Sequence, residues 1–168
     1  FDSDIITRHA KIQNNSGKPI SIRRMMSMQL DLPDCDYYLV TFDGSWALER
    51  TRSDKLLSPG IFINDSKTGV SSARHNPFIM LRKADCGEQT GECYGFNLIY
   101  SSNHAEICEV THWGKTRILM GINPFTFTYE LSENQCFYTP EAVLTFSYEG
   151  LNGISRNMHS FVNKHIVR

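Results

Sequence analysis

The sequence predicts an all-β fold, an antiparallel β-sandwich with one helix at its C-terminal end. Apolar and polar residues alternate with a period of two along most of the chain, as they do in half-buried strands. Turn-forming residues separate these runs, and the pattern indicates no helices between them. Near residue 150 the period changes, and apolar residues then recur every three or four positions.

The expected strands follow directly from the alternation. The first long run keeps one parity apart from Met25, which breaks the pattern; its apolar members are Ile20, Ile22, Met26, Met28, Leu30 and Leu32. Three later runs behave alike: Tyr94-Phe96-Leu98-Tyr100, Phe125-Phe127-Tyr129-Leu131 and Ala142-Leu144-Phe146-Tyr148. The turn signals include Asn14-Asn15-Ser16-Gly17, Asp43-Gly44, Ser58-Pro59-Gly60, Ser102-Asn103 and Asn123-Pro124. Many short strands of this kind are typical of a sandwich.

The last stretch predicts an amphipathic helix from about Leu151 to His165. Its apolar stripe comprises Leu151, Ile154, Met158, Phe161, Val162 and Ile166. We expect this helix to pack on the sheet and to bury Ile154, Met158, Phe161 and Val162, because burial of each such side chain contributes about 1.5–3 kcal/mol.

Length and composition exclude several classes of protein. The 168 residues correspond to a single domain, residues 1–168, or to part of a larger one. Seventeen basic and eighteen acidic residues give a net charge of −1, so bulk charge does not favour nucleic acid or an acidic membrane as a partner. No stretch approaches the roughly 18 apolar residues of a membrane span. The start, Phe1 to Asp4, has neither an initiator Met nor a signal-peptide pattern, so we expect a fragment or a processed product.

The five cysteines predict reduced thiols in a cytoplasmic protein, because their number is odd and they form no small-domain framework. A disulfide between Cys86 and Cys93 is an alternative. A zinc site formed by Cys93, His104, Cys108 and His112 is another, and it would require a helix. Residues 107–113 favour a strand, on which residues four apart lie about 13 Å from each other. We therefore predict no metal and no other cofactor.

Local motifs identify no catalytic site. The G-x-S-x-G, P-loop and G-x-G-x-x-G patterns do not occur. The eighteen carboxylates are scattered through strands and turns, where we expect them to be solvated. We interpret His75 as a turn histidine bonded to backbone rather than as a base. Four aromatic residues are candidates for stacking on sugars, although core packing is the commoner role of aromatics in a sandwich: Tyr37, Tyr38, Trp46 and Trp113.

Five blocks in a fixed order carry a family resemblance. The first is DYYLVTFDGSWALER at residues 36–50. The others are HNPF at 75–78, GECYGF at 91–96, GINPF at 121–125 and TPEA at 139–142, and the chain closes with GLNG at 150–153. Together, over residues 4–168, they resemble family 36 glycoside hydrolases, chiefly α-galactosidases.

The resemblance implies the later half of an N-terminal β-supersandwich, which is similar to the galactose-mutarotase fold. In the family a (β/α)8 barrel follows, and it holds the nucleophile and the acid/base carboxylate of a retaining mechanism. We therefore expect no catalytic residue and no activity in this chain alone. A sandwich without its front half is also expected to expose apolar faces or strand edges.

The family further implies partners and one site residue. Its members are typically bacterial, intracellular and oligomeric, and this domain helps to wall the sugar pocket and carries subunit contacts. The implied partners are an α-galactoside such as melibiose or raffinose, the barrel, and further copies of the chain. The tyrosine after the aspartate of the first block is associated with the substrate pocket, which makes Tyr37 the candidate substrate-binding residue. Its neighbour Tyr38 points to the opposite face of the strand.

Two other functions remain open at this point. A free-standing carbohydrate-binding module would need an exposed aromatic platform within the chain. An aldose epimerase shares the supersandwich fold, but its chemistry needs a His/Glu acid–base pair in one cleft. No such pair here matches the motifs of that family, and fold alone does not imply function.

Overall fold

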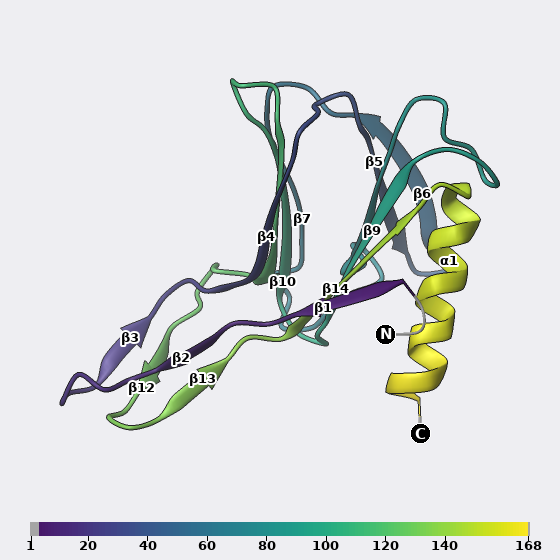
Figure 1. The fold of residues 1–168 in the computed structure, drawn as a ribbon. Helices are drawn as coiled ribbons and strands as arrows, with labels where there is room; N and C mark the ends of the chain where they lie inside the picture. The colour runs from purple at the N-terminus through teal and green to yellow at the C-terminus, as the bar shows by residue number, and fades with distance from the viewer. Residues whose placement is uncertain (1–3, 168) are drawn as a thin grey trace.

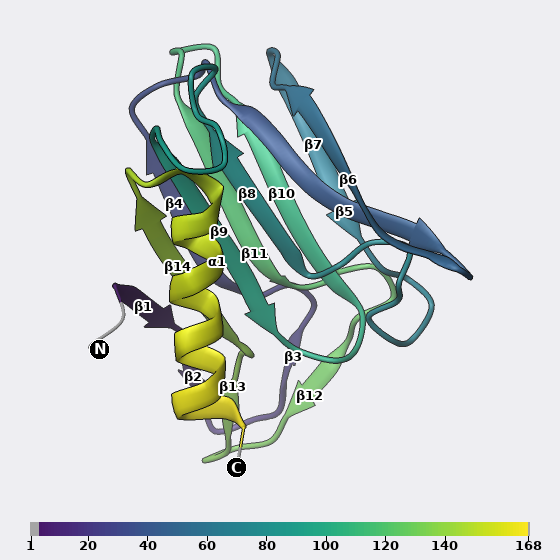
Figure 2. The same cartoon turned by 90° about the vertical axis from the view of Figure 1, so that its right-hand side faces the viewer.

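Three layers stack in the computed structural model of the chain, which describes residues 4–167 (Figure 1). A six-stranded sheet with the order β1-β14-β9-β8-β5-β6 faces a four-stranded sheet with the order β4-β11-β10-β7. Helix α1 (Gly150–Phe161) lies on the outer face of the six-stranded sheet (Figure 2) and continues into the π-helical turn η1 (Val162–Ile166). The paired strands of both sheets are antiparallel. The predicted antiparallel sandwich with a C-terminal helix is confirmed.

The strands divide among two sheets and two short ribbons. The six-stranded sheet contains β1 (Ile5–Arg8), β14 (Glu141–Ser147), β9 (Cys93–Ile99), β8 (Phe78–Arg82), β5 (Tyr38–Ser45) and β6 (Leu48–Leu56). The four-stranded sheet contains β4 (Met26–Leu32), β11 (Thr116–Ile122), β10 (His104–Val110) and β7 (Gly60–Asp65). Two ribbons pair β3 (Ile20–Ile22) with β12 (Tyr129–Leu131) and β2 (Lys11–Gln13) with β13 (Cys136–Tyr138). These ribbons form an arm that projects away from the sandwich (Figure 1).

The inner core lies between the two sheets and consists of the strand residues of one parity. From the six-stranded sheet it includes Leu39, Leu81 and Phe96, each no more than 1% exposed. Ile118 and Met120 of β11 face them and are 0% exposed. Burial between the two sheets therefore explains the period-two alternation, because every second side chain of a strand points into this core.

The outer core lies between the six-stranded sheet and α1. Val40, Met80 and Val143 have the opposite parity and contact the helix side. The helix contributes the buried residues Leu151, Ile154, Met158 and Phe161, whereas Val162 is only partly buried. The predicted apolar stripe is thus confirmed from Leu151 to Phe161, whereas Ile166 in the turn η1 is 43% exposed. Because the six-stranded sheet is covered on both faces, segments such as Ile79-Met80-Leu81 are continuously apolar.

Two of the alternating runs depart from the expected strands. The run from Ile20 to Leu32 is divided between β3 in the arm and β4 in the sandwich. In the run from Phe125 to Leu131 only Tyr129–Leu131 is a strand, because Thr126 adopts a φ of 55° in a turn after Pro124. Phe125 is consequently 53% exposed, while Leu131 is fully buried.

An open groove of about 840 Å³ runs beside β1, β14 and β4. Its lining includes Ile6, Leu30, Phe96 and Leu144, and the Ile6 side chain is 68% exposed. An apolar face exposed in this way is typical of a surface that contacts another part of a protein. Across residues 4–167, no helix has the length and apolar character needed to traverse a lipid bilayer.

Candidate functional site

Tyr37 lies directly before β5 and is 1% exposed within the inner core. Its ring meets that of Tyr94 edge-on, with 6.0 Å between the ring centroids. The Lys83 ammonium lies over the Tyr37 ring at 4.2 Å from the centroid. Burial raises the pKa of the Tyr37 hydroxyl, which keeps it protonated at neutral pH. The structure therefore places the predicted site residue among core contacts.

Lys83 anchors the segment that precedes Tyr37. Its Nζ donates to Asp34 Oδ2 at 2.7 Å and to Asp36 Oδ1 at 2.5 Å. Burial alone would lower the pKa of Lys83, but the two carboxylates outweigh this effect and raise it. Tyr38 points to the other face, where the Arg82 guanidinium lies 4.5 Å from its ring centroid. The opposite orientations of Tyr37 and Tyr38 follow from the pleat of the strand.

Trp46 occupies the tip of the β5–β6 hairpin and is 95% exposed. The tip is sharply turned, because Ala47 and Arg50 both have positive φ values, of 62° and 60°. Beside the hairpin, a polar cavity of about 440 Å³ is lined by Glu49, Arg50, Ser71, Ser72, Ala73, Asn76 and Pro77. The indole is thus exposed at the tip of the hairpin, and Glu49 and Arg50 of the same hairpin line the cavity with groups that can form hydrogen bonds with a sugar.

Tyr37 and Trp46 lie at opposite ends of β5. The strand has eight residues, which span about 26 Å at roughly 3.3 Å per residue. The two aromatic side chains therefore cannot both contact one galactosyl group. Trp113 is 76% exposed, but it lies in the β10–β11 turn, whose Gly114 adjoins Cys35 near the start of β5. It is thus at the end of the sandwich away from Trp46.

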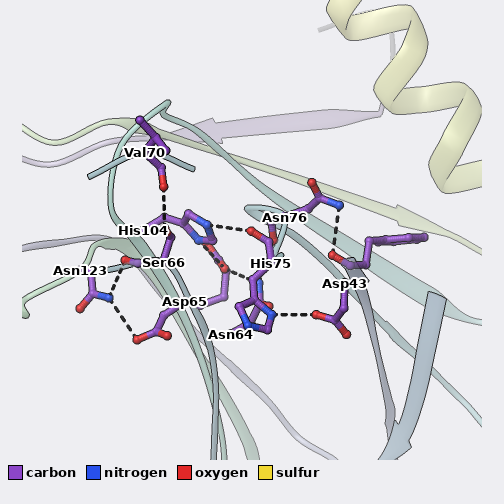
Figure 3. A network of polar contacts seen from close by, with 11 residues as sticks. Asp43, Asn64, Asp65, Ser66, Val70, His75, Asn76, His104 and Asn123 are labelled. Carbon is purple, nitrogen blue, oxygen red and sulfur yellow. Dashed lines mark hydrogen bonds and ion pairs between the residues drawn. The ribbon is translucent and has the colours of Figure 1, made fainter. Parts of the chain in front are cut away.

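The interpretation of His75 as a histidine bonded to backbone needs correction. Its Nδ1 lies 2.8 Å from Asp43 Oδ1, and half of its side chain is exposed. Thr41 Oγ1 donates to the other Asp43 oxygen at 2.8 Å, which orients the carboxylate. The His75 side chain thus has a hydrogen-bond partner on the hairpin strand. Its backbone carbonyl accepts a hydrogen bond from His104 (Figure 3).

The expectation that the carboxylates are solvated is wrong for Glu106, which is 0% exposed. Its carboxylate is within 3.1 Å of His104 Nδ1 and accepts a 2.7 Å hydrogen bond from Asn64 Nδ2. Sequence reasoning treated His104 only as a zinc ligand and did not select Glu106. The signal was present, because both share the parity of the apolar residues Cys108 and Val110 on one strand.

The cysteines are free thiols, and all five lie within the described residues. Cys93 belongs to the outer core and Cys108 to the inner core, so the sheet separates two of the four side chains considered for zinc. Within residues 4–167, no three metal-binding side chains cluster together. The strand predicted for residues 107–113 is present as β10 (His104–Val110), which ends at Val110, before His112 and Trp113.

Comparisons with known proteins give a consistent picture. The family described as the glycosyl hydrolase family 36 N-terminal domain matches residues 1–132. The alpha-galactosidase AgaA of Geobacillus stearothermophilus is 38% identical over 165 residues, which cover 98% of this chain and 23% of that enzyme. An alpha-galactosidase of Lactobacillus acidophilus is 35% identical over 167 residues, which cover 99% of this chain and 23% of that enzyme.

Solved structures agree with these relatives. The crystal structure of the alpha-galactosidase from Lactobacillus brevis has a TM-score of 0.96 and 40% identity, with 99% of this chain and 22% of that chain covered. Variants of the Geobacillus enzyme AgaA, 38% identical over 98% of this chain and 23% of theirs, were crystallised with raffinose and with stachyose; their TM-scores are 0.96 and 0.95.

The fold and these matches define a β-sandwich domain of a glycoside hydrolase. The chain belongs to glycosyl hydrolase family 36, and it corresponds to the N-terminal domain of the α-galactosidases of that family. It spans less than a quarter of the length of the relatives that it matches.

Proposed function

We propose that the complete protein carrying this chain is an α-galactosidase that hydrolyses terminal α-galactosides such as melibiose or raffinose. In this proposal the chain is one domain of the enzyme, and the nucleophile and acid/base carboxylates belong to a barrel domain outside it. The protein acts in the bacterial cytoplasm, in keeping with five free thiols. The observation that carries the proposal is the match along 98–99% of the chain to enzymes of this one activity.

The activity is tested by comparing the complete protein with the isolated chain on an aryl α-galactoside. We expect turnover by the complete protein and none by the chain alone, because enzymes of this kind accelerate reactions at least ~10⁶-fold and this chain would lack both catalytic carboxylates. Turnover by the isolated chain that survives further purification would contradict the assignment. An inactive but folded complete protein would contradict the α-galactosidase proposal itself.

We infer that the domain contributes to the wall of the sugar pocket through the β5–β6 hairpin. Trp46 is 95% exposed at the tip, and the adjoining cavity is lined by charged and hydroxyl side chains. An exposed indole offers an apolar face for the C–H surface of galactose, and its N–H can donate a hydrogen bond. In an isolated soluble domain such exposure has no packing role, which supports a role against another surface.

Tyr37 is the other candidate for a substrate contact, on the strength of its position in the family's first block. Its ring would pack against galactose and its hydroxyl would form a hydrogen bond. Burial among Tyr94, Lys83 and the inner core supports the competing role of a structural tyrosine. Because Tyr37 and Trp46 lie at opposite ends of β5, kinetic measurements on the two variants distinguish them.

Subunit contacts are the remaining part of the proposal, and we assign them to the arm. Tyr138 is 55% exposed and Tyr129 is 40% exposed on ribbons that project beyond the sandwich. Aromatic residues are enriched at protein interfaces. Replacement of Tyr138 by Lys is expected to lower the oligomeric state of the complete protein in analytical ultracentrifugation. An unchanged mass distribution would remove the arm from the interface.

A carbohydrate-binding module is the alternative that a specific observation favours, because Trp46 is the kind of exposed aromatic that such a module requires. The two functions differ in what the isolated chain does. A module binds galactose by itself, whereas the wall of a shared pocket needs the barrel. Titration calorimetry of the isolated chain with galactose separates them, and measurable affinity would favour the module.

A further inference from the structure

A buried polar cluster, formed by Asn64, His104 and Glu106, connects the four-stranded sheet to the loop of residues 71–77. His104 and Glu106 are 0% exposed and Asn64 is 3% exposed. Asn64 and Glu106 are direct partners across the β7–β10 ladder, so their side chains leave the same face of the sheet. Figure 3 shows Asn64 and His104 directed toward the segment that contains His75 and Asn76.

One buried acidic side chain, Glu106, orients two neighbouring side chains in this cluster. Glu106 Oε2 accepts from Asn64 Nδ2 at 2.7 Å, and both carboxylate oxygens lie within 3.1 Å of His104 Nδ1. The same Asn64 amide donates to Asn76 O at 2.8 Å, and His104 Nε2 donates to His75 O at 3.1 Å. A carbonyl can only accept, so His104 Nε2 carries a proton in either charge state of the ring. Two consecutive backbone carbonyls of the loop are therefore fixed by Glu106 through its two partners.

The same loop residues bind the hairpin on their other side. The backbone N–H and the side-chain Nδ2 of Asn76 both donate to Phe42 O at 3.1 Å. Gly44 N donates to Arg74 O at 3.1 Å, and His75 Nδ1 pairs with Asp43 Oδ1. A Cβ on Gly44 would lie only 2.5 Å from Leu48 O and 3.1 Å from Ala73 O, so the hairpin and the loop are in close contact.

We propose that Glu106 is a positioning residue: through Asn64 and His104 it fixes the 71–77 loop, and the loop in turn fixes the β5–β6 hairpin that presents Trp46. Glu106 itself is buried and cannot contact a ligand directly. The link to sugar binding rests on the proposed function, whereas the fixing of the hairpin does not. The cluster also requires one geometry of the loop, because any other arrangement would leave the buried donors Asn64 Nδ2 and His104 Nε2 without their carbonyl acceptors.

Two substitutions at Glu106 separate hydrogen bonding from packing. Glu106→Gln retains the cluster, because its amide nitrogen can donate to His104 Nδ1 while its oxygen accepts from Asn64 Nδ2. Glu106→Met keeps the length of the side chain but removes both interactions. Ile118→Val, at a fully buried position of β11 outside the cluster, is the matched control for a loss of core stability.

Hydrogen exchange measured by mass spectrometry on the complete protein gives a readout that does not depend on activity. For Glu106→Met we expect amides in residues 42–50 and 71–78 to exchange at least about tenfold faster, because Asn64 and His104 no longer hold the loop in place and the loop no longer holds the hairpin. We also expect a higher KM for an α-galactoside with kcat changed little, as for a wall residue that is displaced. Glu106→Gln should match the wild type in both measurements, and Ile118→Val should leave these two segments unaffected relative to the other strands.

Several results would overturn the proposal. Folded Glu106→Met with unchanged exchange in both segments would show that the cluster does not position the hairpin. Glu106→Gln behaving like Glu106→Met would show that hydrogen bonding is not the means. If Glu106→Met does not fold, Asn64→Ala removes the bond to Asn76 O but keeps the Glu106–His104 pair, and unchanged exchange in 71–78 would again overturn it. Faster exchange in Glu106→Met together with normal kinetics of Trp46→Ala would support positioning while contradicting the proposed pocket wall.

Discussion

Trp46 and Trp113 provide a matched pair of exposed indoles at opposite ends of the sandwich. If Trp46 contacts substrate, Trp46→Ala in the complete protein should lower kcat/KM by roughly tenfold, which corresponds to the loss of about 1.4 kcal/mol of aromatic contact. Trp113→Ala should leave kcat/KM unchanged. Steady-state kinetics on raffinose measure both, and equal effects of the two substitutions would rule out a specific contact by Trp46.

The substitution Tyr37→Phe tests whether Tyr37, the second candidate residue, contacts the substrate. As a substrate contact, Tyr37 would lose one hydrogen bond, about 0.5–1.5 kcal/mol or roughly 2- to 13-fold in kcat/KM. As a core residue it would lower the melting temperature without changing kcat/KM per folded enzyme. Thermal melts and kinetics on the same preparation decide between the roles, and a kinetic defect in Tyr38→Phe instead would shift the assignment by one residue.

The sequence predicted single candidate residues of the site, but it did not predict which residues lie together. Trp46 was one of four aromatic residues that could stack on a sugar, but the family's first block pointed to Tyr37, and the sequence did not show that Trp46 is exposed. The cluster of Asn64, His104 and Glu106 was not predicted. Asn64 precedes Glu106 by 42 residues in the chain, and only strand pairing brings β7 beside β10. Alternation shows which face a side chain takes but does not show which strands are neighbours.

Among the strands, Asp54 connects the edge strand β6 to β8 across β5. It accepts from Arg52 Nε at 2.7 Å and from Arg82 Nε at 2.8 Å. The hydrogen bond from Arg52, with a smaller contribution from Arg82, outweighs burial and holds the pKa of Asp54 below its usual value of 3.8. A lowered pKa stabilises the fold above about pH 4, and this stabilisation is lost as the pH falls through the folded-state pKa.

Asp54→Asn should therefore reduce the free energy of unfolding at pH 7 by up to about 1 kcal/mol, the usual range for partly exposed pairs. The difference from the wild type should shrink as the pH is lowered below 3.8. Urea titrations at pH 7, 4 and 3 measure it, with Asp85→Asn at an exposed carboxylate as the control. A difference that is independent of pH would show that the carboxylate charge is not the cause.

The contact between β9 and α1 depends on a missing side chain. A Cβ on Gly95 would lie 2.5 Å from Ile154 Cγ2, so Gly95→Ala should cost about 1–3 kcal/mol by overpacking. Ile154→Ala should cost about 2–5 kcal/mol through the cavity that it leaves. The double variant should lose less than the sum, because the new methyl group enters that cavity. Additive losses in chemical denaturation would show that the two positions do not pack together.

The sequence predicted a strand or helix correctly where one of its faces is buried in a core. The helix and strands β9 and β14 match their periodic patterns, because burial imposes the pattern. The division of Ile20–Leu32 and the turn at Phe125–Thr128 were missed. In the turn before β12, apolar and polar residues alternate in type, yet Phe125 is exposed, so the same pattern does not report burial there.

The whole molecule is a sandwich with one open side and one projecting arm. The groove beside β1, β14 and β4 and the exposed Tyr138 of the arm are surfaces that an isolated domain rarely leaves uncovered. The fold class followed from the alternation, whereas the layered arrangement required tertiary pairing. The six-stranded sheet is the central layer, because its two faces belong to different cores.

The thiols of Cys93 and Cys108 lie on opposite faces of this central sheet, so their reactivity shows whether the two cores open together or separately. Cys93 lies in the outer core and Cys108 in the inner core, and burial raises the pKa of each to about 12. Only a thiolate reacts rapidly with an alkylating reagent, so both buried thiols react only when the protein opens, whereas the exposed Cys35 reacts at once and gives the intrinsic rate. Since one sheet serves both cores, we expect Cys93 and Cys108 to be alkylated at a common rate in timed labelling followed by peptide mass spectrometry. Earlier modification of Cys93 would instead mean that α1 detaches while the sandwich stays closed.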